Sequence, residues 1–80
     1  MSEERTEELG KVRARALEAS VALEERATEV LELAKRIEEL TGGTPGWYPG
    51  MRARVEAGKT VRQARLLLRA LGDIDRSARG

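Results

Sequence analysis

The stretch that decides the fold runs from Leu9 to Leu40, LGKVRARALEASVALEERATEVLELAKRIEEL, and contains no proline. Apolar side chains recur in it every three or four residues, which is the period of an amphipathic helix. With Leu9 at heptad position a, the a and d positions form an a/d stripe of Leu9, Val12, Ala16, Ala19, Leu23, Arg26, Val30, Leu33, Ile37 and Leu40. Such a stripe, sustained over more than four heptads, is typical of a coiled coil.

The signals at its two ends predict a helix over residues 3–41. Ser2 can cap the helix, and Glu3 and Glu4 suit the positive end of its dipole. Gly42 can adopt the left-handed backbone that terminates helices. At 1.5 Å per residue, the helix is about 57 Å long.

The rest of the chain predicts a connector and a shorter helix. Residues 42–50 are rich in glycine and proline, residues 51–72 regain helical character, and residues 73–80 form a frayed tail. The second helix is either continuous through Gly58 or broken there, with a restart at the capping-box pattern Thr60-Val61-Arg62-Gln63. We favour the continuous helix, and the whole chain, 1–80, is then a single all-α domain, a helical hairpin.

Helix lengths predict that this hairpin assembles into an oligomeric bundle. A returning helix of about 33 Å covers the a/d stripe from Leu23 to Leu40, next to the connector, but not Leu9, Val12 and Ala16 near the N-terminus. A second apolar row, which includes Leu17, Val21 and Leu31, lies across the helix from the first and indicates burial on two sides. The predicted oligomer interface is Leu9, Val12, Ala16, Leu17, Val21, Leu23 and Leu31.

Three large side chains have two interpretations each. Trp47 and Tyr48, the two aromatic residues of the chain, either plug the loop end of the hairpin or anchor a partner protein. The plug is the interpretation that we favour. Arg26, the charged residue within the a/d stripe, either fixes the register of an oligomer or extends its stem to reach water or a glutamate.

Charge is divided between the two halves of the chain. Residues 1–43 carry 7 Lys/Arg and 11 Asp/Glu, a net −4, and residues 44–80 carry 8 and 3, a net +5. This asymmetry predicts two helices that attract each other. The alternative is a DNA-binding protein in which residues 51–72 resemble a helix-turn-helix and the long helix dimerises. The nucleic-acid face would then comprise Arg52, Arg54, Lys59, Arg62, Gln63, Arg65 and Arg69.

Composition argues against an enzyme. There is no cysteine and no histidine, which removes thiolate chemistry and the commonest general base and metal ligand. We expect no cofactor, no metal and no membrane span, and an acidic start that is not a signal peptide predicts a soluble, cytoplasmic protein. A chain rich in Ala, Glu, Leu and Arg is typical of artificial bundles and of thermophile proteins alike. The function expected is non-enzymatic interaction or assembly, chiefly with itself and secondarily with another protein.

Overall fold

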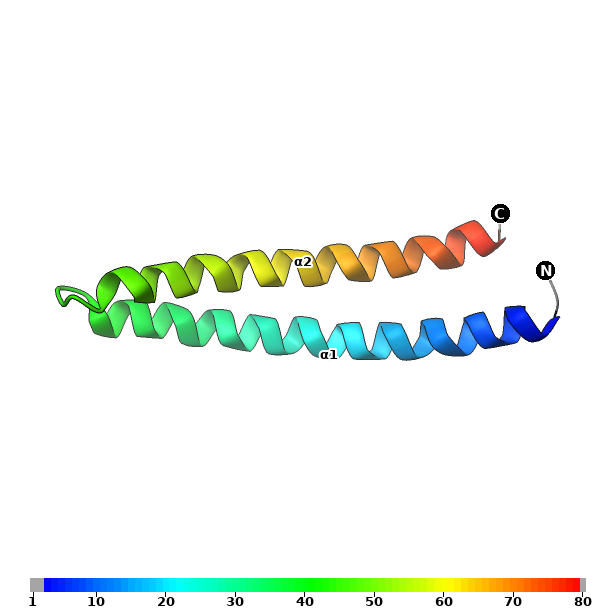
Figure 1. Ribbon diagram of the computed structural model, residues 1–80, viewed down its shortest axis with the longest axis horizontal. Helices are drawn as coiled ribbons and strands as arrows, with labels where there is room; N and C mark the ends of the chain where they lie inside the picture. Colours follow the sequence, from blue (N-terminus) through cyan, green and yellow to red (C-terminus); the bar gives the residue numbers. More distant parts are fainter. Residues whose placement is uncertain (1–2, 80) are drawn as a thin grey trace.

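The protein is an extended hairpin of two antiparallel helices (Figure 1). The computed structural model describes residues 3–79, with the side chains of 75 and 77–79 left aside, so the predicted cap Ser2 lies outside the described residues. Helix α1 covers Glu3–Thr41 and α2 covers Trp47–Arg79. The Cα atoms extend over 61 × 18 × 12 Å, which confirms the predicted all-α hairpin and makes it one helix layer thick.

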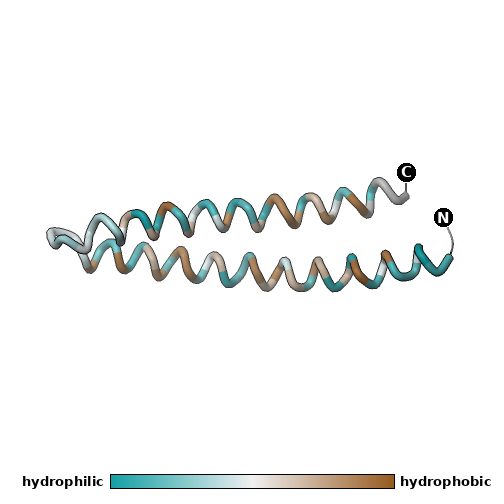
Figure 2. Tube along the Cα trace, viewed as in Figure 1, coloured by the Kyte–Doolittle hydropathy of each residue, from teal (hydrophilic) through white to brown (hydrophobic). Residues whose placement is uncertain are grey.

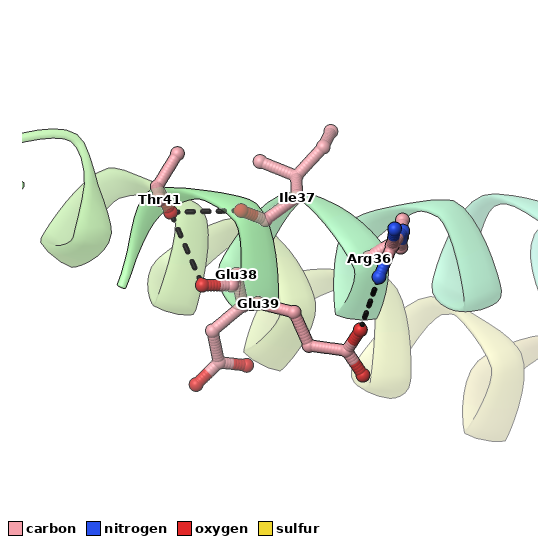
Figure 3. Close-up of polar contacts among 5 residues, drawn as sticks. All are labelled: Arg36, Ile37, Glu38, Glu39 and Thr41. Atoms are coloured by element: carbon pink, nitrogen blue, oxygen red, sulfur yellow. Dashed lines mark hydrogen bonds and ion pairs between the residues drawn. The ribbon is translucent and has the colours of Figure 1, made fainter. Parts of the chain in front are cut away.

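Glycine and threonine terminate α1 where the sequence predicts. The Thr41 hydroxyl donates to the carbonyl oxygens of Ile37, at 2.8 Å, and Glu38, at 3.3 Å (Figure 3). The left-handed residue is Gly43, with a φ of 79° that residues with a Cβ rarely adopt, and not Gly42 as the sequence predicts. The helix therefore stops here because its last carbonyls are satisfied locally and the chain reverses at a glycine.

Thr44, in the connector, caps the start of α2. Its side-chain oxygen accepts a hydrogen bond from the Gly46 amide at 3.2 Å, and its carbonyl accepts one from the Trp47 amide at 3.1 Å. The connector is thus residues 42–46, shorter than the predicted 42–50. Pro49 lies in the first turn of α2, where a missing N–H leaves no helical hydrogen bond unmade.

Helix α2 is longer than the sequence predicts, and it is unbroken. It runs through Gly58, as the continuous interpretation requires, and the turn of the helix-turn-helix interpretation is not present. It also passes Gly72, so the predicted end at residue 72 and the tail from residue 73 are wrong. A single glycine in a helix costs about 1 kcal/mol, which the flanking helical residues offset. The argument that a short second helix leaves the N-terminal half of α1 without a neighbour therefore fails.

Small side chains form the contact between the helices. The buried positions of α1 are Ser20, Ala27 and Ala34, and those of α2 are Gly50, Ala57, Val61 and Ala64. Most are seven residues apart, so each set forms a row along its helix. Ala27 and Ala34 are only 6% and 5% exposed, and we call this small-residue contact the seam. No side chain among the described residues is fully buried, which makes the core of the single hairpin thin.

Candidate interaction surface

The a/d stripe of α1 lies to the side of the contact with α2. The seam uses the e positions, Ser20, Ala27 and Ala34, together with the half-buried b positions Leu17 and Leu31. These positions are centred about 100° around the helix from the centre of the a/d stripe, at 100° per residue. The prediction that the returning helix covers the stripe from Leu23 to Leu40 is therefore wrong. Alanine and serine allow a closer approach of two helix axes than leucine and isoleucine do, so α2 packs on the small residues.

Seven large side chains of the a/d stripe are left in contact with solvent. Leu40 is 67% exposed, Leu33 is 58% and Val30 is 55%. The exposed set is Leu9, Val12, Leu23, Val30, Leu33, Ile37 and Leu40. Figure 2 shows hydrophobic residues distributed along both helices over the length of the hairpin, not gathered at one end. A long row of exposed aliphatic side chains, in contrast to scattered single ones, marks an interaction surface.

The stripe continues onto one flank of α2. A shallow groove, mostly apolar in its lining, joins the helices there and is lined by Leu23, Arg26, Ala27, Val30, Ala57 and Thr60. Leu67 and Ile74 follow Thr60 at intervals of seven residues, so they extend the same flank, and both are exposed. The a/d stripe and this Thr60–Leu67–Ile74 flank together form one side of the hairpin, which we call the apolar face.

Only part of the predicted oligomer interface lies on this face. Leu9, Val12 and Leu23 belong to its exposed stripe, and Ala16 is half-buried within it. The remaining predicted residues lie elsewhere: Leu17 and Leu31 contribute to the seam, and Val21 is exposed on the far side of the seam from the stripe. The prediction omitted Val30, Leu33, Ile37 and Leu40, which it assigned to the intramolecular contact. The row of small e-position residues was the sequence signal that could have corrected it.

The opposite side of the hairpin is charged. Arg54 forms an ion pair with Glu38, and the Nε of Arg65 lies 3.3 Å from the Oε1 of Glu24. Both glutamate side chains are largely shielded by the neighbouring helix, at 22% and 25% exposure. A second groove opens on this side, lined by Thr28, Leu31, Glu32, Lys35, Arg54, Val55, Gly58, Val61, Arg62 and Arg65. The acidic helix α1 and the basic helix α2 thus form ion pairs with each other at one edge of the seam.

The predicted nucleic-acid face is not one continuous surface. Arg54 and Arg65 pair with α1, and Lys59 pairs with Glu56 on its own helix at 3.2 Å. Arg62 and Arg69 are exposed on the charged side, whereas Arg52, Lys59 and Gln63 are turned toward the back of α2. Seven residues that the sequence grouped are therefore spread over about half of the helix circumference. Nucleic-acid binding through them stays a prediction.

Trp47 and Tyr48 lie at the first turn of α2 and are 44% and 58% exposed. The interpretation of these aromatic rings as a plug of the loop end is therefore wrong, since a plug would be shielded from solvent. Their role as a partner anchor stays untested. The side chain of Arg26 is 80% exposed, and its Nη1 donates to Glu29 at 3.0 Å, so within one hairpin it reaches both water and a glutamate.

Metal-binding clusters and membrane-spanning helices are absent from the described residues 3–79. No group of three or more His, Cys, Asp and Glu side chains lies close enough to hold a metal ion. Neither helix in this range has the length and apolarity needed to cross a membrane. The apolar face is therefore the candidate functional surface of the described residues.

No protein-family model matches this chain, and no curated protein sequence or solved structure does. Similarity to other proteins therefore assigns no function to the hairpin.

Proposed function

We propose that the protein is a self-associating helical module in which two copies pack their apolar faces together. The observation that carries the proposal is the a/d stripe: seven large aliphatic side chains in heptad spacing, exposed and outside the contact with α2. The occupant that fits a heptad stripe is another helix of matching period, because knobs of one must enter holes of the other. A second copy supplies such a helix.

The small size of the seam is a second argument for a partner, because one hairpin buries little apolar surface. Its buried apolar side chains are four alanines and Val61. Each methyl or isopropyl group removes little apolar surface from water, at about 25 cal/mol per Å². Chains of this size with a modest core usually add disulfides, a metal or oligomerisation, and this chain has no cysteine. Burial of the stripe in a dimer would supply the larger apolar contacts that one hairpin lacks.

The area of the apolar face suits a stable dimer. From Leu9 to Leu40 the stripe is about 47 Å long at 1.5 Å per residue. Multiplied by the 18 Å width of the hairpin, this gives roughly 850 Å². Specific protein interfaces bury about 800 Å² on each partner, so one face of this size is sufficient.

The angle between seam and stripe is that of a four-helix bundle. In a square arrangement each helix contacts two neighbours in directions about 90° apart, with side chains of both rows turned inward. The seam and the a/d stripe of α1 are separated by about 100°, and the Thr60 flank of α2 lies about 70° from its own seam. Two hairpins placed face to face thus complete a bundle.

The test is the mass of the protein in solution, with a matched pair of variants. Sedimentation equilibrium at micromolar concentration should give the mass of two chains for the native sequence. Leu33→Glu places two carboxylates in the interface of each dimer and should weaken association by at least 100-fold, because an unpaired buried charge costs several kcal/mol. Leu66→Glu, at a leucine of similar exposure on the back of α2, should leave the dimer unchanged. A native protein with the mass of one chain would contradict the proposal.

A further inference from the structure

A row of residues lies along the outer edge of the a/d stripe. When the row is taken in the opposite direction, each of its charges is replaced by one of opposite sign. The g positions of α1 are Glu8, Arg15, Ala22, Glu29 and Arg36. All five are exposed and lie on the side of the stripe away from α2. Their charges read negative, positive, neutral, negative, positive. Read from the other end, the row has the opposite sign at every charged position.

This pattern distinguishes two ways of pairing α1 with a second α1. In antiparallel pairing centred on Ala22, Glu8 meets Arg36 of the second copy, and Arg15 meets Glu29. In parallel pairing in register, each layer of the stripe meets its own copy, so Arg26 would face Arg26 across a d layer. Like charges in one layer destabilise an interface, and complementary flanking charges set helix orientation. The charges favour the antiparallel arrangement.

Side-chain size in the stripe agrees with this register. The layers formed between stripe residues are Leu9 with Leu33, Val12 with Val30, Ala16 with Arg26, and Ala19 with Leu23 of the second copy. Ile37 and Leu40 lie beyond these layers, with Ile37 opposite Arg5 of the second copy. Each alanine of the stripe thereby faces a longer side chain, and the stem of Arg26 has the space beside Ala16 that it needs. The existing contacts of Arg26 with Glu29 and of Arg36 with Glu39, both 3.0 Å, are exposed pairs within one helix, which contribute little and exchange readily.

The same centre suits α2. The ion pair between Arg65 and Glu24 places these two residues side by side across the seam. Because the helices are antiparallel, residue 21 or 22 of α1, where the pairing is centred, lies beside residue 67 or 68 of α2. Leu67 is the middle residue of the Thr60–Leu67–Ile74 flank and is exposed. A twofold axis at this level brings Leu67 against Leu67 of the second copy, and the two helices of each hairpin then share one axis.

We infer that, within the self-association proposed above, α1 packs antiparallel on α1 of a second copy, centred near Ala22, with Arg15 and Glu29 selecting this orientation and register. The competing arrangement sets α1 against α2 of the second copy, acidic helix against basic helix. It would oppose seven large aliphatic side chains of the stripe to the sparser flank of α2, where Leu67 and Ile74 are the large ones.

Charge reversal tests the inference through partner choice. Arg15→Glu alone sets glutamate against Glu29 twice in each dimer, and Glu29→Arg alone sets arginine against Arg15 twice. Each variant should dimerise roughly tenfold more weakly, as two exposed ion pairs are lost and two repulsions appear. An equimolar mixture of the two variants should form a heterodimer with near-native affinity, detectable by native mass spectrometry.

The matched control separates local pairing from net charge. Glu18→Arg changes the charge as Glu29→Arg does, but Glu18 is exposed at a c position that faces away from the stripe. Mixed with Arg15→Glu, it should give no preference for the heterodimer. Equal preference in both mixtures would overturn the inference, since net charge alone would then explain partner choice.

Crosslinking measures orientation directly, and the absence of native cysteine makes single-cysteine variants unambiguous. With a short bismaleimide, Glu8→Cys mixed with Arg36→Cys should crosslink, whereas Glu8→Cys alone should not, because antiparallel pairing separates the two copies of residue 8 by about 42 Å. Self-crosslinking of Glu8→Cys would show parallel pairing. No crosslink in either sample, with the dimer mass retained, would mean that α1 packs on α2 or that the two α1 helices pair in another register. Either outcome would contradict the proposed orientation and register but not self-association. A native protein with the mass of one chain would contradict both proposals.

Discussion

The two apolar faces of α1 carry side chains of different size and meet different surroundings. The seam has Ser20, Ala27 and Ala34, which are buried, and the a/d stripe has leucine, valine and isoleucine, which are exposed. Hydrophobicity alone would rank the two faces the other way. In one hairpin, the face that allows the closest approach of the backbones packs, and the more hydrophobic face is left for a further contact. Side-chain size therefore decides which face of α1 packs against α2.

The largest expected effect comes from enlarging the seam. Ala27→Leu puts three more carbon atoms where the exposed fraction is 6%, and overpacking of this kind costs about 3 kcal/mol. We expect the free energy of unfolding to fall by that amount in urea, followed by circular dichroism at a fixed protein concentration.

The control adds volume outside both apolar faces. Val21→Leu adds one methylene at a residue that is 47% exposed and lies in neither the seam nor the a/d stripe, and it should change the free energy of unfolding by less than about 0.5 kcal/mol. Equal losses for the two variants would mean that the close contact at Ala27 is not what the larger side chain disturbs.

Gly50 tests how closely the helices approach near the connector. A Cβ on Gly50 would lie 2.9 Å from Thr41 Oγ1 and 3.5 Å from the Cα of Glu38. The Thr41 hydroxyl is held by two carbonyls, so it cannot move aside without losing hydrogen bonds. We expect Gly50→Leu to lower the free energy of unfolding by about 2 kcal/mol, measured in the same way.

Gly10 provides the matched glycine. A Cβ there meets nothing within 4 Å, so Gly10→Leu should raise stability by about 0.5–1 kcal/mol through helix propensity. If Gly50→Leu also stabilised the protein, the close approach of α1 and α2 at this end would be disproved.

The smallest expected effect concerns the charged edge of the seam. Glu38→Gln removes the charge partner of Arg54 while keeping the shape of the side chain, and should cost about 1 kcal/mol at low salt and less at high salt. Thermal unfolding at two ionic strengths measures it. Glu39→Gln, whose pair with Arg36 is exposed on the surface of one helix, should cost no more than about 0.5 kcal/mol.

The sequence predicts the hairpin and the start of its loop because those features depend on local rules. The apolar period of α1 and the glycines at 42 and 43 act through neighbouring residues, and the structure confirms the helix over residues 3–41. The left-handed residue is Gly43, one position after the predicted Gly42. The end of α2 was missed because Gly72 resembles a terminator, yet it has no positive φ and the helix continues. A glycine ends a helix only where the chain also has a reason to reverse.

The candidate surface was harder to predict, because two stripes compete for one partner helix. The periodicity of α1 locates both faces but does not rank them, and the more hydrophobic stripe was assigned to the wrong neighbour. Trp47 and Tyr48 were misjudged for a related reason: burial of a loop aromatic depends on whether the hairpin has depth, and one layer of helices offers none.

The antiparallel course of the helices has a mechanical consequence. Glu3 and Arg79 lie at the same end of the hairpin, opposite the connector (Figure 1). A force that pulls these ends apart acts across the seam and opens it one layer at a time, like a zipper, instead of shearing all layers together. A single hairpin of this kind therefore has little resistance to such a force. It opens from the end with Glu3 and Arg79 toward Gly43, over its 61 Å length.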